Sequence, residues 1–117
     1  MKKKLYNVAK KDGRYSFEVI KFVNEALGYT VKNCAGKPGH ITGKVFCGGL
    51  QKLAIEKWGR LAKLVLNTGG VRTTRDIGEI VFLMIENQWM SAQPTDSIDD
   101  FNDVYDFETV FKKQFTF

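Results

Sequence analysis

The chain has few of the residues on which common chemistries depend. Its 117 residues include one histidine, two cysteines and two prolines, and its longest purely apolar run is the short stretch 80–85. A membrane span requires roughly 18 apolar residues, so no segment is expected to cross a bilayer. Because His40 alone would have to carry proton transfer at neutral pH, the sequence gives no support for a hydrolase, and we expect a protein that is not an enzyme.

The start of the chain and its cysteines bear on the cellular compartment. Met1 is followed by three lysines, as in a signal peptide, but Asn7 and the pair Lys10 and Lys11 break the apolar stretch that must follow. Export is therefore not expected. We expect a cytoplasmic chain in which Cys34 and Cys47 remain reduced thiols.

Charge is divided unevenly along the sequence. The net charge is +5, residues 1–75 hold 16 Lys or Arg against four Asp or Glu, and residues 76–117 hold two against nine. Two interpretations remain open. A basic face could meet nucleic acid or another anionic partner, or the two parts could neutralise each other within the fold.

Apolar residues at helical spacing predict a mainly α fold, with residues 1–117 forming one compact domain of about five helices. The first helix is expected over 16–27, between an N-cap at Ser16 and a closing Gly28. The β-friendly residues 29–31 then form either a short strand or an extra helical turn.

Four further helices are expected, each with its own start signal. One begins behind Thr42, and a shorter one covers about 60–67 before a glycine pair. Thr73 has capping-box spacing to Asp76 and starts the most apolar helix, and Asp106 caps a final aromatic helix. Residues 88–106 form either a loop or a small β-hairpin, and a hairpin would give a winged-helix outline.

The apolar faces of these helices define a predicted core. Its members are large aliphatic residues on the three central helices. They are Ile77, Ile80, Val81, Met84, Leu50, Leu53 and Leu64.

The loop before the second predicted helix is a candidate anion site. Lys37, His40, Thr42 and Lys44 lie close to a helix N-terminus, whose free amides favour phosphate or sulfate. The segment fails the nucleotide-hydrolase pattern, because Pro38 replaces a required glycine and Val45 follows the lysine in place of Ser or Thr. The alternative is a surface loop with ordinary lysines.

The start of the most apolar helix is a candidate nucleic-acid site. Arg72, Thr73, Thr74 and Arg75 would lie at the beginning of a recognition helix in a winged helix-turn-helix. An acidic wing and an apolar helix both oppose this interpretation. The alternative is a helical hairpin packed wholly in the core.

No metal site is predicted. Cys34, His40 and Cys47 are chemically suited to zinc, but their spacing matches no standard finger and a fourth ligand is missing. The acidic run that begins at Asp96 lacks the turning glycine of a calcium loop, and Ile98 occupies a ligand position.

Short motifs cover nearly the whole chain, in segments 14–15, 22–31, 40–43, 49–50, 65–67, 76–82, 100–101 and 105–108. These motifs resemble a family of small uncharacterised bacterial proteins of the planctomycete and verrucomicrobial groups. The resemblance implies one compact domain, but no activity, cofactor or site residue.

The sequence therefore favours a non-enzymatic binding or adaptor module for a macromolecular partner. We expect a protein partner in preference to nucleic acid, and neither a cofactor nor a membrane. Nucleic-acid binding through the basic part and anion or small-ligand binding at the loop 36–45 are the alternatives.

Overall fold

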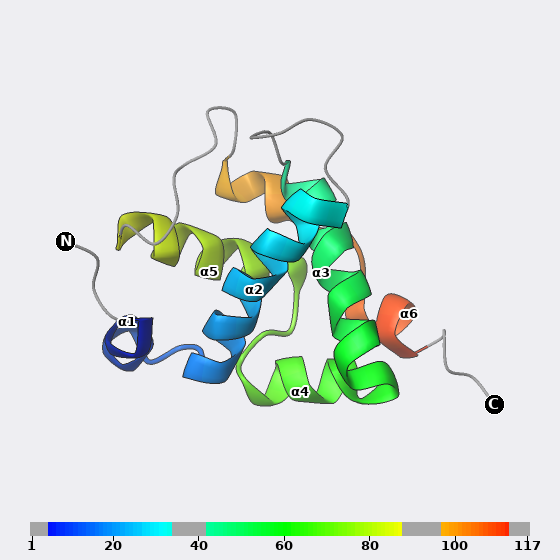
Figure 1. The fold of residues 1–117 in the computed structure, drawn as a ribbon, viewed down its shortest axis with the longest axis horizontal. Helices are drawn as coiled ribbons and strands as arrows, with labels where there is room; N and C mark the ends of the chain where they lie inside the picture. Colours follow the sequence, from blue (N-terminus) through cyan, green and yellow to red (C-terminus); the bar gives the residue numbers. More distant parts are fainter. Residues whose placement is uncertain (1–4, 34–41, 88–96, 113–117) are drawn as a thin grey trace.

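The computed structural model describes residues 5–33, 42–87 and 97–112. It contains α1 (Leu5–Asp12), α2 (Phe17–Asn33), α3 (Gly43–Trp58), the 3-10 helix η1 (Gly59–Leu61), α4 (Ala62–Thr68), α5 (Thr74–Glu86), the 3-10 helix η2 (Ile98–Phe101) and α6 (Phe107–Lys112). The expected mainly α fold is confirmed. In Figure 1, α2 crosses in front of α3, α5 lies to one side, and α4 lies below. In the described part of the chain, no helix is both long and apolar enough to span a bilayer.

Helix α2 is longer than its sequence pattern predicted. Ser16 caps its start as expected, accepting a hydrogen bond from the amide three residues on at 3.1 Å. The helix continues through Gly28, so the predicted end there is wrong, and residues 29–31 form the additional turn. Tertiary packing explains the difference, because Thr30 is fully buried and its hydroxyl donates to the Ala26 carbonyl at 2.7 Å.

Helices α2 and α3 are the pair with the most extensive contact. Gly49 lies directly against Thr30, and a Cβ atom built there would lie 2.1 Å from the Thr30 Oγ1. Near the other end of α3, the rings of Phe22 and Trp58 stack with centroids 4.4 Å apart. The missing side chain at Gly49 therefore sets how closely the two helices approach.

Helix α3 ends at Gly59 and α4 begins after one 3-10 turn, close to the predicted boundary. Gly59 adopts φ 55°, which a residue with a side chain rarely adopts. On α4 the buried residues are Ala62 and Leu66, which are one helical turn apart. Leu64 lies halfway between them in sequence and so points to the opposite side, where it is 62% exposed. Its assignment to the core is therefore wrong, whereas the other six predicted core residues are buried.

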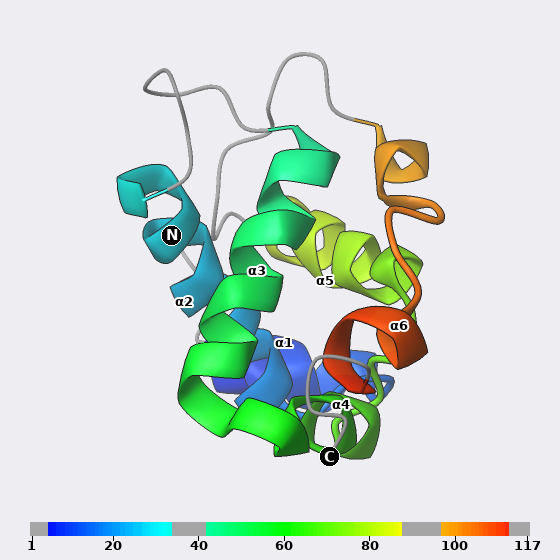
Figure 2. The ribbon, with the colours of Figure 1, turned by 90° about the vertical axis from the view of Figure 1, so that its right-hand side faces the viewer.

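Helix α5 lies beside the α2 and α3 pair and buries one face, which includes Ile77, Ile80 and Met84. The capping box is present, because the Asp76 amide donates to the Thr73 hydroxyl and the Asp76 carboxylate accepts from the Thr73 amide. Gly78 lets η2 pack close to the helix, since a Cβ there would lie 2.7 Å from the side chain of Phe101. Figure 2 shows η2 and α6 on the same side of the molecule, linked by an extended segment.

The ends of the fold contain two elements that the pattern did not identify. Helix α1 was missed, because Asn7 and two lysines interrupt its apolar positions, although Ala9 is buried. The described part of the proposed hairpin, 97–106, forms η2 and turns, with no strand, while 88–96 lie outside the described residues. Helix α6 starts at the predicted Asp106 cap, whose carboxylate accepts from the Thr109 amide at 3.1 Å.

Replacing Gly49 with alanine should destabilise the protein, whereas replacing its neighbour Gly48 should not. Overpacking a core typically costs about 1–3 kcal/mol, and an added methyl at Gly49 collides with Thr30. At Gly48 a Cβ meets nothing within 4 Å, so the higher helix propensity of alanine should stabilise the fold by up to about 1 kcal/mol. The free energies of unfolding from urea titration test this pair. Equal effects of the two substitutions would contradict the proposed close approach.

Candidate functional site

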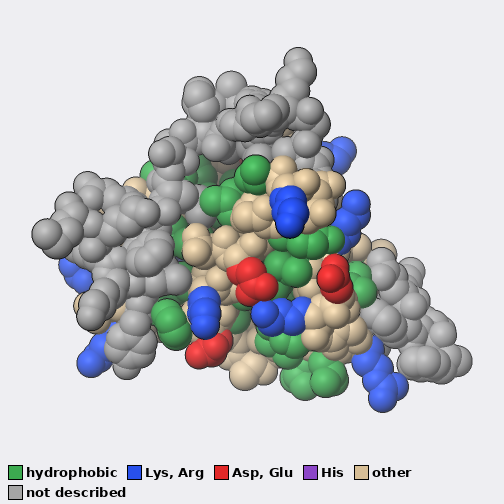
Figure 3. All heavy atoms as spheres, in the orientation of Figure 1, with side chains coloured by type: hydrophobic (Ala, Val, Ile, Leu, Met, Phe, Trp, Pro, Cys, Tyr) green, Lys and Arg blue, Asp and Glu red, His purple; other side chains and the backbone are tan. Residues whose placement is uncertain are grey.

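The two oppositely charged parts of the chain meet in the fold. Of the six ion pairs between described residues, four join residues 1–75 to residues 76–117. They are Arg14–Glu79, Lys63–Glu108, Arg75–Glu79 and Arg75–Asp99. On the face in Figure 3, basic and acidic side chains alternate and do not gather into a field of one sign. The arrangement favours internal neutralisation over a continuous basic surface.

Glu79 lies at the centre of the best-connected part of this network. It accepts from the Arg14 guanidinium at 3.0 Å and from the Arg75 guanidinium at 3.1 Å. The hydrogen bond from Arg14 is the main reason why the pKa of Glu79 is lowered. Next to it, the Tyr15 hydroxyl donates to Asp76 at 2.7 Å, and burial, followed by this bond, raises the pKa of Tyr15. These charged and polar groups hold elements together.

The four predicted nucleic-acid residues do not form one exposed surface. Thr74 is only 1% exposed, and its hydroxyl donates to the Phe101 carbonyl at 2.6 Å and accepts from the Val104 amide at 3.1 Å. Arg75 is held by Glu79, Asp99 and Asn102. Thr73 is exposed but caps α5.

Arg72 is the one member of that group whose charged end is available. It is exposed, and no described side chain pairs with its guanidinium. Only its backbone amide is engaged, donating to Asp76 at 2.9 Å. A single cation contributes little to a phosphate-binding surface, because affinity for nucleic acid grows with the number of phosphates contacted.

The predicted anion site is described only in part. Thr42 caps α3 as expected and accepts from the Val45 amide at 3.1 Å, and Lys44 is exposed. Lys37 and His40 lie outside the described residues. The start of α3 also faces the acidic segment, since a Cβ at Gly43 would lie 2.9 Å from the Asp100 backbone carbonyl. A carbonyl in this position opposes an anion there.

Cys47 is buried and fully inaccessible on α3. Burial raises the pKa of its thiol to about 12, so the thiolate that a metal requires is strongly disfavoured. The other two candidate zinc ligands, Cys34 and His40, lie outside the described residues. Among the residues that can be assessed, no group of three or more metal-binding side chains forms.

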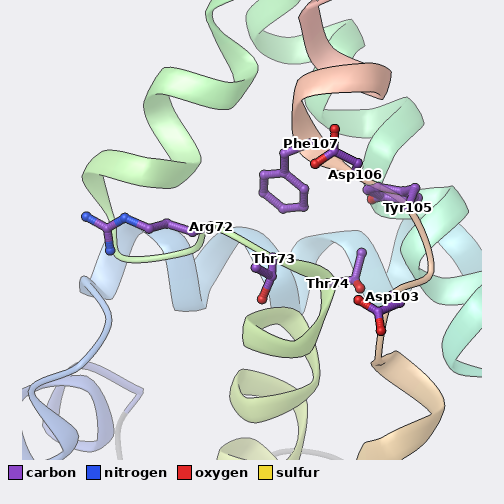
Figure 4. Close-up of a pocket in the computed structure, with 7 residues that line it drawn as sticks. All are labelled: Arg72, Thr73, Thr74, Asp103, Tyr105, Asp106 and Phe107. Carbon is purple, nitrogen blue, oxygen red and sulfur yellow. The ribbon is translucent and has the colours of Figure 1, made fainter.

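A pocket of about 260 Å³ lies where α5 begins and where the chain runs from η2 to α6. Its lining combines the segment before and at the start of α5 with the connection into α6 (Figure 4). The lining residues are Arg72, Thr73, Thr74, Asp103, Tyr105, Asp106 and Phe107. Thus three of the predicted nucleic-acid residues lie in one cavity, but together with two carboxylates.

Four lining residues, Asp103, Tyr105, Asp106 and Phe107, were not predicted as site residues. Asp103 and Tyr105 fell within the predicted hairpin or loop, and Asp106 and Phe107 were assigned to the cap and start of the last helix. Their meeting with Arg72 depends on the two hydrogen bonds at Thr74, which connect residues about 30 positions apart in sequence. The one local signal was the density of aspartate and aromatic residues in 99–107.

A second surface feature is apolar. Leu61 is 54% exposed and Leu64 is 62% exposed, and they are three residues apart on η1 and α4. Side chains at this spacing lie on one side of a helix. Exposed apolar groups that adjoin one another are a feature of interaction surfaces.

Comparison of the chain with protein-family models, curated proteins and solved structures finds no match.

Replacing Thr74 with valine should destabilise the fold, although Thr74 belongs to a predicted binding motif. Valine keeps the shape but leaves the Phe101 carbonyl and the Val104 amide without their partner, at about 1–3 kcal/mol for each buried group. The exposed Arg72→Ala should change stability by less than about 0.5 kcal/mol. Urea denaturation of both variants measures the difference. A Thr74→Val protein as stable as the parent would contradict the role assigned to this hydroxyl.

Stability should fall as the pH rises above about 9. The pKa of Cys47 is raised to about 12 from an ordinary 9.0, so the folded state keeps a proton that the unfolded chain releases. The resulting contribution to the free energy of unfolding is complete below the pKa of the thiol in the unfolded chain. Above that pKa it is lost at about 1.4 kcal/mol per pH unit. Tyr105, whose pKa is also raised by burial, acts in the same direction. Unfolding measured at pH 8 and pH 10.5 tests this, and a Cys47→Ala variant should show a shallower fall.

Proposed function

We propose that this chain is a non-enzymatic binding module whose partner is a protein. The observation that carries the proposal is the pocket beside α5, where an exposed arginine, two aspartates and two aromatic residues line one cavity. Protein surfaces offer both signs of charge together with apolar groups. A pocket of mixed chemistry suits such a partner better than a polyanion.

The surroundings of the titratable groups support a binding role over catalysis. Described groups with shifted pKa values are either buried, such as Cys47 and Tyr105, or engaged in ion pairs, such as Glu79. The Tyr105 hydroxyl donates to the Cys47 carbonyl at 2.8 Å, which fixes its ring in place. A general acid or base must instead reach a substrate with its titrating atom. These groups are used to hold the fold.

Nucleic-acid binding is the alternative, and the charge network weighs against it. Arg14, Lys63 and Arg75 all pair with carboxylates of the acidic part. Each pair would have to be broken before its cation could neutralise a phosphate. Asp103 and Asp106 also line the same pocket as Arg72, which has no such pair among the described residues.

Leu61 and Leu64 supply apolar contact area that a protein partner can bury. Burial of apolar surface contributes roughly 25 cal/mol per Å² and drives most protein association. The ion pair between Lys63 and Glu108 lies beside this patch and gives it a polar rim. Hydrophobic contacts with a polar rim are the usual composition of a protein interface.

The same proposal includes the setting of the protein. We infer a bacterial chain of the family whose motifs it resembles, acting in the cytoplasm. The buried thiol of Cys47 is compatible with a reducing compartment.

The choice between the two partners is tested by fluorescence titration with labelled duplex DNA, single-stranded DNA and RNA at low and physiological salt. We expect weak binding at low salt that is lost at about 0.15 M, because ion pairs already engage Arg14, Lys63 and Arg75. Arg72→Ala should weaken that binding more than Lys52→Ala, which deletes an exposed cation elsewhere.

A peptide array of varied twelve-residue sequences, probed with the labelled full-length chain, supplies the positive arm. Binders whose amide shift changes map to the pocket or to the Leu61 and Leu64 patch are the expected result. Tight nucleic-acid binding at physiological salt, with no peptide bound, would overturn the proposed function.

A further inference from the structure

The interior of the pocket is acidic, although an arginine belongs to its lining. In Figure 4 the guanidinium of Arg72 points away from the other labelled side chains. On the opposite side of the pocket, Asp106 lies near Phe107 and Asp103 lies near Thr74. The charge that faces a guest is therefore negative.

These carboxylates retain free acceptor positions. One oxygen of Asp106 accepts from the backbone amide and hydroxyl of Thr109, both at 3.1 Å, and no described donor reaches the other oxygen. Asp103 is exposed, and among the described residues no donor contacts its carboxylate. A carboxylate can accept several hydrogen bonds, so each of these residues can accept from a cationic donor.

Two aromatic residues complete the lining. Phe107 stands between the start of α5 and the segment 103–106, and Tyr105 lies beside it with ring centroids 5.9 Å apart. Tyr105 is held by its bond to the Cys47 carbonyl, and Phe107 is held by an edge-on contact with Phe111 at 5.1 Å. Aromatic rings attract cations, most strongly where water is partly excluded. Phe107 is only 3% exposed, so the rings form the floor of the pocket and the carboxylates are the groups that a guest reaches.

The size of the pocket limits what can enter it. Sites for cofactors and drug-sized ligands measure roughly 300–1,000 Å³, and this cavity measures about 260 Å³. Four of its lining residues, Arg72, Thr73, Asp103 and Asp106, are exposed, so the cavity is open to the surface. An open cavity of this size admits one long side chain from a neighbouring molecule more readily than a whole cofactor.

We propose that this pocket takes the basic side chain, arginine or lysine, of a partner protein. The inference rests on the proposed function and adds the chemistry of the residue recognised. The cationic head binds at the exposed carboxylates of the lining, those of Asp103 and Asp106. A guanidinium suits the site best, because its planar fork of donors matches the geometry of a carboxylate.

The test uses the full-length protein and N-acetyl-arginine amide as the probe, followed by amide chemical shifts. N-acetyl-citrulline amide has nearly the same shape without the charge, and N-acetyl-glutamate amide carries the opposite charge. We expect shift changes at Thr73, Thr74 and residues 103–107 with the arginine probe alone. Equal binding of the citrulline probe, or preferred binding of the glutamate probe, would overturn the inference.

Two matched variants assign the effect to the pocket. Asp103 adopts φ 50°, a conformation that asparagine also tolerates, so Asp103→Asn removes the charge and preserves the backbone. Glu56→Gln removes one exposed charge elsewhere. Asp103→Asn should weaken binding of the arginine probe about threefold to fivefold, as for a partly exposed charge pair, and Glu56→Gln should leave it unchanged. Equal weakening by both would show attraction to net charge alone and would contradict the site.

The peptide array separates failure of this inference from failure of the proposed function. If array peptides bind and map away from residues 72–74 and 103–107, the chain is a protein-binding module but the assignment of the pocket is wrong. If bound peptides map to the pocket and lose affinity when their arginine is replaced by citrulline, both proposals are supported. If no peptide binds and the arginine probe is also silent, both are overturned.

Discussion

The hydroxyl of Thr74 holds together the two parts of this fold that differ most in charge. It donates to the Phe101 carbonyl and accepts from the Val104 amide, so that the acidic segment is fixed to the first turn of α5. The close approach at Gly78, where the ring of Phe101 fills the place of a side chain, packs the same segment against the helix. The pocket exists because these contacts place residues 103–107 opposite residues 72–74.

This attachment also determines what the charges can do. A net charge of +5 suggests a protein that binds nucleic acid. Arg75, however, is engaged by Asp99 of η2 and by Glu79 of its own helix. Surface ion pairs of this kind contribute little to stability, about 0–1 kcal/mol each. Under the proposed function their consequence is for recognition, since the face in Figure 3 is of mixed sign. The cavity lined by Asp103 and Asp106 then suits a cationic group.

Much of the fold could be predicted from local chemistry, because caps and helical periodicity act over a few residues. The caps at Ser16, Thr42 and Thr73 were identified correctly, since each depends on a hydrogen bond to an amide close by. Gly28 and Leu64 were misjudged because packing decides both positions. Burial of Thr30 against α3 continues α2 beyond Gly28, and burial of Ala62 and Leu66 turns Leu64 outward. The pocket was missed for the same reason, since it joins segments that no local pattern connects.

The most direct measurement is native-state hydrogen exchange at the Val104 amide. Its bond to the buried Thr74 hydroxyl predicts slow exchange, with protection comparable to that of the core amides of α5. The same experiment on Thr74→Val should lower protection at Val104 while leaving the α2 and α3 amides protected. Exchange at the unfolded rate in the parent protein, with α5 still protected, would contradict the account, because an undocked acidic segment would leave neither the charge pairing nor the pocket.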